Sequence, residues 1–322
     1  MRYRKLGRTG LEVSEVGYGA WGIGGVMWAD SEDETSLKAL EHAISLGLNF
    51  IDTAYVYGDG HSEELVAKVH KRHPKTIVAT KIPGKNMRWP AQPNVPIQDV
   101  FPVQWMLDCT DRSLKKLGVE QIDLQQMHVW SPDFIHNDEW REARERLMKA
   151  GKIRFFGVSV NDHQPQSVME LVKTGLVDTV QVIYNIFDQS PGDGLTALCR
   201  ELNVGVIARC PFDEGGLTGA IKPGVKFEPS DWRNRYFSGD RPQQVWDRVQ
   251  KLQKEIGDAA VSLPDAALRY CLSDPAVSTV IPGMRRPSSV EQNCASSDRG
   301  PLPKDLLARL KAHRWERNFY GA

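Results

Sequence analysis

The chain lacks both an excess of charge and any long apolar run. Its 322 residues contain 41 Lys and Arg against 41 Asp and Glu, so the formal net charge is zero. A balanced charge gives no overall attraction to nucleic acid or to an anionic lipid surface. No uninterrupted apolar stretch is long enough to span a bilayer. We therefore expect neither nucleic acid nor a membrane as a partner.

Cysteine is also scarce, and its spacing suggests no pairing. There are five cysteines, an odd number, and no two have the CxxC spacing: Cys109, Cys199, Cys210, Cys271 and Cys294. This pattern argues against a disulfide framework and against a zinc site, so we expect no metal. Residues 1–7 carry no apolar core of a signal peptide. We therefore expect a cytoplasmic protein in a reducing compartment.

The chain does contain 41% hydrophobic residues, arranged as strand-length apolar runs that alternate with segments of helical period. The alternation predicts eight strands, at residues 16–20, 49–52, 76–80, 122–127, 153–159, 179–184, 204–208 and 277–281. Helices are expected at 34–46, 62–71 (with Ser62 as N-cap), 103–117, 138–150, 166–173, 194–202, 261–272 and 287–294, with extra helices at 247–256 and 304–313.

Eight repeats of strand and helix are the count of a (β/α)8 TIM barrel, in the α/β class. Residues 6–13 contain Gly7-Arg8-Thr9-Gly10, which predicts a hairpin that leads into the barrel. Residues 83–102 and 211–242 are long loops, and loops of this length are often functional lids. No linker or low-complexity stretch marks a second domain, so we expect one barrel domain over residues 1–322.

A glycine motif near the start suggests a different fold, which we reject. Residues 17–22 match the GxGxxG pattern after a strand. The dinucleotide-binding fingerprint needs a helix that opens at the third glycine. Here helical periodicity resumes only near Glu34. We interpret the segment as a loop at the rim of the barrel.

Four residues in the first half of the chain form a candidate proton relay. Asp52, Tyr57, Lys81 and His128 each lie at or just after the end of an expected strand. In a parallel barrel, catalytic groups gather at the carboxyl ends of different strands. Taken singly, such residues are more often turn caps, surface groups or satisfied core groups. The four together, at successive strand ends, favour chemistry on a carbonyl oxygen.

The motifs around these residues resemble the aldo-keto reductase family, in the branch related to potassium-channel β subunits. Asp52-Thr53-Ala54-Tyr55-Val56-Tyr57-Gly58 is similar to the family signature, and so is the segment from Leu11 to Trp21. Thr80-Lys81, residues 123–128 and Ile281-Pro282-Gly283 follow in the family's order. The resemblance extends from the leading hairpin to about residue 295, and it implies a reductase on a (β/α)8 barrel.

Both the side-chain chemistry and the resemblance make Tyr57 the general acid. A free phenol has a pKa of about 10, and a nearby ammonium lowers it. Lys81 would supply that ammonium, and Asp52 would keep Lys81 charged and oriented. His128 would hydrogen-bond the substrate oxygen or share the proton.

The hydride must come from a cofactor, because no side chain supplies one. The resemblance implies NADPH, with NADH the less favoured coenzyme. It places the nicotinamide carboxamide against Ser159 and Gln181, with Asn161 one position later than the family's usual asparagine. Arg209 occupies the position of a stacking tyrosine, and Arg285 and Arg286 precede a helix where a 2′-phosphate would bind. The remaining expected cofactor contacts are Tyr184, Pro211, Phe212, Gly216, Leu217, Gly219, Gly283, Ser289, Gln292 and Asn293.

We expect the carbonyl substrate to lie among the aromatic residues Trp21, Tyr55, Trp89 and Trp130, with Trp28 and Met87 as secondary candidates. Few residues follow the last expected helix, which predicts a pocket open to bulky carbonyls. A homo-oligomer is compatible with the sequence, which also leaves open the natural substrate and the physiological direction.

Two other functions remain open. Some relatives, including potassium-channel β subunits, bind NADPH mainly as regulatory or sensing proteins with slow turnover. The same fold also supports Schiff-base aldolases, in which Lys81 would be the nucleophile. That role needs a lowered lysine pKa, whereas a carboxylate such as Asp52 would raise it.

Overall fold

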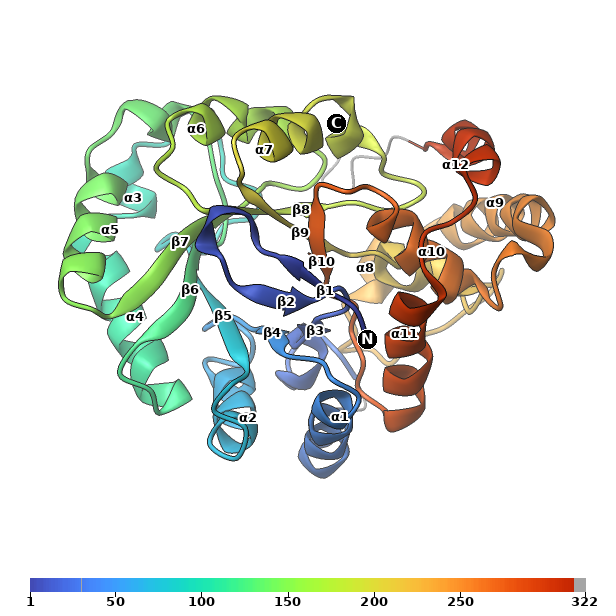
Figure 1. Cartoon of the computed structure of the whole chain (residues 1–322), viewed down its shortest axis with the longest axis horizontal. Helices are drawn as coiled ribbons and strands as arrows, with labels where there is room; N and C mark the ends of the chain where they lie inside the picture. The colour runs from blue at the N-terminus through green and yellow to red at the C-terminus, as the bar shows by residue number, and fades with distance from the viewer. Residues whose placement is uncertain (30, 316–322) are drawn as a thin grey trace.

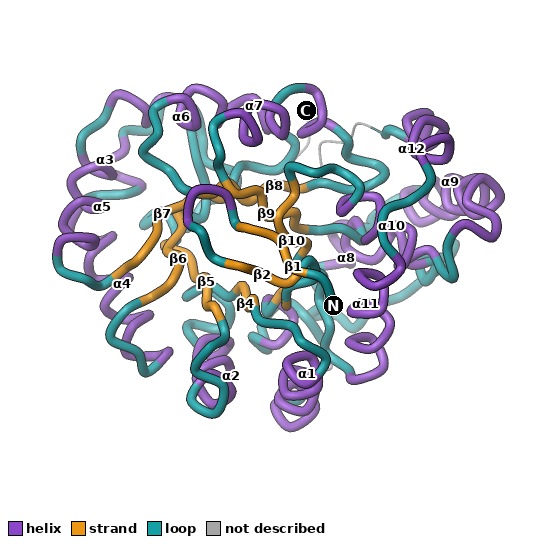
Figure 2. The backbone as a smooth tube through the Cα atoms, in the orientation of Figure 1, coloured by secondary structure: helices purple, strands orange, loops and turns teal. Residues whose placement is uncertain are grey.

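The computed structural model describes residues 1–29 and 31–315, and these form a parallel barrel surrounded by helices (Figures 1 and 2). The hydrogen-bonded order of the eight-stranded sheet is β10-β9-β8-β7-β6-β5-β4-β3, so strands adjacent in sequence are neighbours in space. Gly17 N donates to Val280 O at 2.8 Å and Gly19 N to Pro282 O at 3.0 Å. These bonds join the first strand to the end of the last, which closes the predicted (β/α)8 barrel.

The barrel strands are β3 (Tyr18–Gly19), β4 (Phe50–Asp52), β5 (Ile77–Ile82), β6 (Ile122–Met127), β7 (Ile153–Ser159), β8 (Thr179–Ile183), β9 (Gly205–Arg209) and β10 (Val277–Val280). The helices are α1 (Asp33–Ser45), α2 (His61–His70), α3 (Ile97–Val100), α4 (Val103–Leu117), α5 (Glu139–Lys149), α6 (Met169–Lys173), α7 (Leu195–Glu201), α8 (Arg233–Tyr236), α9 (Arg241–Ile256), α10 (Leu263–Leu272), α11 (Pro287–Arg299) and α12 (Lys304–Leu310).

Several expected boundaries need correction. Ser62 is not an N-cap, because α2 begins one residue earlier, after Gly60 in the left-handed conformation. The Ser62 hydroxyl instead donates to Ala20 O at 2.9 Å and so ties α2 to the β3 loop. The first half of the expected helix at 166–173 lies in a 3-10 turn, Pro165–Val168. The two long loops contain the short helices α3 and α8. Residues 316–322 of the C-terminal tail lie outside the described residues.

The predicted leading hairpin is confirmed, and it lies across the amino-terminal end of the barrel (Figure 1). Its strands β1 (Tyr3–Lys5) and β2 (Glu12–Ser14) are antiparallel. Leu6 and Val13 from the hairpin pack on the interior residues Phe50 and Leu124. Gly7 approaches the start of β9 so closely that a Cβ would lie 2.2 Å from Gly205 N. The hairpin therefore closes this end of the barrel with apolar side chains.

Alternation along the strands sorts the side chains into two layers. Along β5, Ile77 and Ala79 belong to the interior cluster, whereas Val78 and Ile82 pack outward against the helices. Side chains of a strand point alternately to its two faces, so Lys81 points inward. By the same period of two, a polar side chain points inward near the end of five other strands: Asp52 on β4, Gln126 on β6, Ser159 on β7, Gln181 on β8 and Arg209 on β9. The interior is therefore apolar near the hairpin and polar at the carboxyl ends of the strands.

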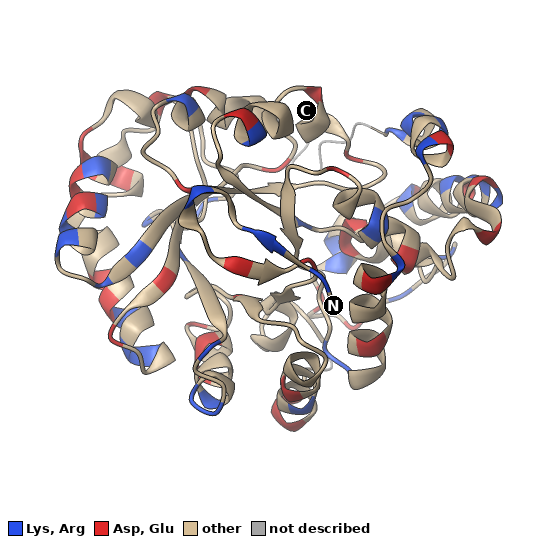
Figure 3. Ribbon diagram, viewed as in Figure 1, with Lys and Arg blue, Asp and Glu red and all other residues tan. Residues whose placement is uncertain are grey.

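The outer helices carry mixed charges. In the view of Figure 3, Lys and Arg alternate with Asp and Glu over the helices around the barrel. Within the described part of the chain, no helix is long and apolar enough to cross a membrane. All five cysteines are free thiols.

Candidate active site

Three of the four predicted catalytic residues form one hydrogen-bonded group. The Lys81 ammonium donates to Asp52 Oδ2 at 2.5 Å, to Thr53 O at 2.8 Å and to the Tyr57 hydroxyl oxygen at 3.2 Å. Lys81 is 1% exposed and Asp52 is 2% exposed. Asp52 is thus the counter-ion of a buried ammonium, which in turn contacts the phenol.

Two glutamines fix the orientation of Asp52. Gln126 was not predicted at all, and Gln181 was predicted only as a cofactor contact. Its Oδ1 accepts a hydrogen bond from Gln181 Nε2 at 2.7 Å and another from Gln126 Nε2 at 3.2 Å. Gln126 and Gln181 lie on β6 and β8, and both are buried. The sequence signal that could have identified Gln126 is a polar residue within the apolar strand at 122–127.

The fourth residue, His128, is held beside Tyr57 by ring packing. The Tyr57 and His128 ring centroids are 5.8 Å apart in an edge-on arrangement. The buried His128 Nδ1 has no hydrogen-bond partner among the described residues. Burial lowers the His128 pKa well below its usual value, and the charges of Lys81 and Arg209 lower it further. His128 is therefore neutral at physiological pH and suited to hydrogen-bonding a substrate oxygen.

The predicted decrease in the Tyr57 pKa is wrong for this structure. Burial raises the pKa of the Tyr57 phenol, and this effect outweighs the opposing charge of Lys81. The phenol is consequently protonated at neutral pH. Burial alone lowers the Lys81 pKa, but the charges and hydrogen bonds of Asp52 and Tyr57 raise it by more. Lys81 is therefore a cation.

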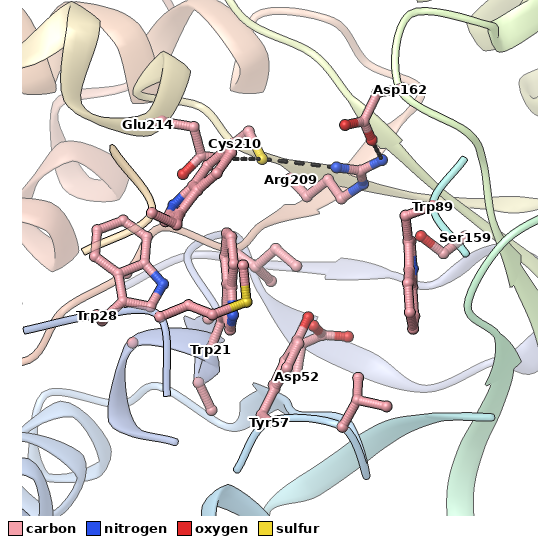
Figure 4. Close-up of a pocket in the computed structure, with 18 of the residues that line it drawn as sticks. Trp21, Trp28, Asp52, Tyr57, Trp89, Ser159, Asp162, Arg209, Cys210 and Glu214 are labelled. Carbon is pink, nitrogen blue, oxygen red and sulfur yellow. Dashed lines mark hydrogen bonds and ion pairs between the residues drawn. The ribbon is translucent and has the colours of Figure 1, made fainter. Parts of the chain in front are cut away.

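A cavity of about 1180 Å³ opens above these residues at the carboxyl ends of the strands. Figure 4 shows Asp52 and Tyr57 on one side of it, Arg209 and Cys210 opposite, and Ser159 beside Trp89. Most of the expected cofactor contacts line the cavity: Ser159, Asn161, Gln181, Arg209, Pro211, Phe212, Gly283, Arg285, Arg286 and Ser289. Segments far apart in sequence thus share one wall.

The cavity also fits a nicotinamide cofactor. Ser159 and Gln181 both line it, and the Gln181 Nε2 is the atom that donates to Asp52 and Gln126. A carboxamide could bond to the Ser159 hydroxyl and to the Gln181 amide oxygen. At another part of the lining, Arg285 and Arg286 precede α11, and the positive end of a helix dipole favours phosphate. Met284, the residue before these arginines, is fully buried and is not part of the cavity lining.

The structure does not bring every expected cofactor contact to the cavity. Tyr184 packs against Tyr270, with ring centroids 5.7 Å apart. Leu217 is buried in the core. The others absent from the cavity lining are Gly216, Gly219, Gln292 and Asn293. Loop side chains turn according to their packing partners, which spacing along the chain does not reveal.

Asn161 lines the cavity, but its amide is engaged elsewhere. Its Oδ1 accepts from Ala91 N at 3.1 Å, and its Nδ2 donates to Ala91 O at 3.2 Å and to Gln164 Oε1 at 3.1 Å. The neighbouring Asp162 bonds Arg209 at 2.6 Å. Arg209 also donates to Val160 O at 2.9 Å. Both Asn161 and Arg209 therefore have structural partners at the site where cofactor contacts were expected.

Three of the four predicted substrate residues line the cavity: Trp21, Tyr55 and Trp89. Trp130 does not, and its assignment was wrong. It is fully buried between Phe134 and Trp140, and its Nε1 donates to Ser167 O at 3.1 Å. The secondary candidates Trp28 and Met87 line the cavity, as do Trp232 and Arg233, which the sequence analysis missed. Trp232 comes from the loop at 211–242. The length of this loop, which is typical of a functional lid, was the sequence signal that could have indicated a role for its residues in the cavity.

Residues 15–314 match the model of the aldo/keto reductase family. The chain is 30% identical over 302 residues to aldo-keto reductase YhdN of Bacillus subtilis, covering 90% of this chain and 87% of that protein. The holo structure of aldo-keto reductase AKR11C1 from Bacillus halodurans superposes with a TM-score of 0.77 at 25% identity, covering 98% of this chain and 96% of that one.

Relatives differ in coenzyme. One, 26% identical over 313 residues (92% of this chain and 93% of that protein), is the NADH-specific methylglyoxal reductase of Escherichia coli. Another, 27% identical over 298 residues (90% and 85%), is aldo-keto reductase yakc [NADP(+)] of Schizosaccharomyces pombe. Taken with the barrel and the Asp52–Lys81–Tyr57 group, the match over nearly the whole length shows that this chain belongs to the aldo/keto reductase family and is an NAD(P)-dependent oxidoreductase acting on carbonyls.

Proposed function

We propose that this protein, working as one barrel domain in the cytoplasm, reduces aldehydes or ketones to alcohols with NADPH, and that Tyr57 is the general acid. The observation that carries the proposal is the Lys81–Tyr57 hydrogen bond of 3.2 Å at the cavity. Lys81 donates to the phenol oxygen, so the phenol's own proton is left to point elsewhere. The open side is the cavity, where a carbonyl oxygen would bind.

The proposed proton transfer uses charges that are already in place. Bound NADPH would supply the hydride. As the Tyr57 proton moves to the carbonyl oxygen, negative charge develops on the phenol oxygen. Lys81 stabilises that charge across the existing hydrogen bond, and Asp52 keeps Lys81 oriented. Neutral His128 would donate a hydrogen bond to the substrate oxygen. A positioned acid of this kind contributes roughly 10²- to 10⁴-fold to the rate.

Ser159 and Gln181 would hold the nicotinamide carboxamide, and Arg285 and Arg286 would bind the 2′-phosphate. The two arginines support NADPH over NADH, because charge-assisted bonds to phosphate are strong. The cationic state of Lys81 supports the reductase over the Schiff-base aldolase, since that nucleophile must be neutral.

The test is NADPH consumption with a panel of aldehydes and ketones, with NADH in parallel, for wild type and Tyr57→Phe. We expect turnover that is faster with NADPH, and a roughly 10²- to 10⁴-fold loss in Tyr57→Phe with unchanged NADPH affinity. Near-normal turnover by Tyr57→Phe would refute the acid assignment. Tight NADPH binding without turnover by wild type would favour the regulatory alternative.

A further inference from the structure

Four aromatic rings form a continuous row around the predicted position of the carbonyl. Trp21 contacts Tyr57 with centroids 6.2 Å apart, Tyr57 contacts His128 at 5.8 Å, and His128 contacts Trp89 at 5.4 Å. In Figure 4, Trp21 and Trp89 lie on either side of an open space, with Tyr57 between and below them. A carbonyl oxygen at Tyr57 would therefore place its substituent between two indoles.

The space between Trp21 and Trp89 is a slot, and its Trp21 side is braced by the rim loop after β3 and by the loop at 211–242. Trp21 packs on Trp28 at 5.3 Å and on Trp232 at 5.4 Å. Trp232 N donates to Met27 O at 2.9 Å, which ties the loop at 211–242 to the rim loop after β3. The bracing keeps the Trp21 ring in place as a wall.

The Trp89 side is fixed by the residue that was expected to bind the cofactor. Asn161, two residues after the end of β7 and 4% exposed, makes two hydrogen bonds to the backbone of Ala91. Ala91 lies two residues after Trp89 in the long loop at 83–102. These bonds hold the Trp89 segment against the barrel, next to the strand that carries Ser159.

Two polar side chains of the cavity lining, Tyr55 and Arg233, are engaged with other protein groups. Tyr55 interacts with Asp59 and Arg112. Arg233 donates to Asp231 Oδ1 at 2.9 Å and Oδ2 at 2.6 Å, and it lies over the Trp28 ring. A polyhydroxylated substrate would have to compete with these bonds, whereas a flat ring gains area from the indole faces.

Building on the proposed function, we infer that the enzyme selects flat aromatic carbonyls, bound between Trp21 and Trp89, and that Asn161 is the positioning residue of the Trp89 wall. Asn161 acts through Ala91 and Trp89, so its loss changes substrate selection and leaves cofactor binding intact.

The test compares 2-naphthaldehyde with its saturated counterpart, decalin-2-carbaldehyde. The ratio of the two kcat/KM values is measured in wild type and in variants, so that the intrinsic reactivities of the aldehydes cancel between proteins. An aromatic contact of this type corresponds to roughly 2- to 12-fold in affinity. We expect Trp89→Leu and Asn161→Ala each to lower the ratio by about that factor, mainly through the KM for 2-naphthaldehyde.

Two further measurements separate positioning from cofactor binding. The NADPH dissociation constant, from protein fluorescence, should be unchanged in Asn161→Ala. The inhibition constant of 2-naphthamide, a non-reacting analogue, should rise in Asn161→Ala and by less in Asn161→Asp, which keeps the acceptor for Ala91 N. The matched control is Asp133→Ala, which removes the bond of Asp133 Oδ2 to Asn94 N, 2.9 Å, in the same loop. It should leave the ratio unchanged.

Three results would overturn the inference. Equal losses for both aldehydes in Trp89→Leu would show that the slot does not select aromatic rings, and this variant leaves the Asn161 tether untouched. Weakened NADPH binding with an intact ratio in Asn161→Ala would make Asn161 a cofactor ligand. Turnover of neither aldehyde by wild type, when other carbonyls are reduced, would refute the substrate class alone; turnover of no carbonyl would refute the proposed function itself.

Discussion

Replacement of Asp52 by Asn should destabilise the protein through Lys81. The ammonium is 1% exposed, and its counter-ion lies 2.5 Å away. Removing one partner of a buried ion pair typically costs about 3–5 kcal/mol, because the other charge stays buried without compensation. Asn keeps an acceptor for Gln126 and Gln181, so the loss is largely that of the charge. This cost is a large share of a total stability of about 5–15 kcal/mol.

The loss should depend on pH with a defined sign. In wild type the Lys81 pKa is raised, so the pair contributes its full stability at neutral pH and loses it only as pH rises through that raised pKa. In Asp52→Asn, burial dominates and lowers the Lys81 pKa. The native state then binds fewer protons than the unfolded state, and the free energy of unfolding rises with pH up to about 10.4.

The assay is urea unfolding of wild type, Asp52→Asn, Lys81→Met and the double variant between pH 6 and pH 9. The double variant removes both charges of the buried pair and should regain most of the lost stability without regaining activity. Equal stability of Asp52→Asn and wild type at every pH would show that the Lys81 charge does not depend on Asp52, and the electrostatic reasoning would fail.

Other predictions test the cofactor site, the loop and the core. Arg286→Ala should weaken NADPH binding roughly 10- to 100-fold more than NADH binding, and equal losses in titration would move the phosphate site elsewhere. Burial raises the pKa of Glu214 to about 7, so the free energy of unfolding of wild type should fall as pH rises from about 4.5 to about 7. Glu214→Gln should remove this slope and be about 1–3 kcal/mol more stable than wild type at pH 8, as measured by urea unfolding of the cofactor-free protein. Trp130→Ala should cost about 3–5 kcal/mol of stability yet keep the preference for aromatic carbonyls, the opposite of Trp89→Leu, and a lost preference would return Trp130 to the pocket.

The sequence by itself determined the periodic elements and the strand-end positions of the catalytic candidates. The predictions for residues 103–117, 122–127 and 153–159 agree with α4, β6 and β7. The strand-end positions of Asp52 and Lys81 also predicted that the two gather at the carboxyl ends of the strands, where they are hydrogen-bonded. For these residues, order along the chain was enough to predict proximity in space.

Only the tertiary structure decided the directions of loop side chains and the balance of charge against burial. Trp89 faces the cavity while Trp130 lies in the core, although both follow barrel strands. Asn161 bonds Ala91, 70 residues away in sequence. The Tyr57 pKa rises although Lys81 adjoins it, since burial outweighs the nearby charge. Loop conformation and desolvation both depend on atoms contributed by distant segments, which no local pattern encodes.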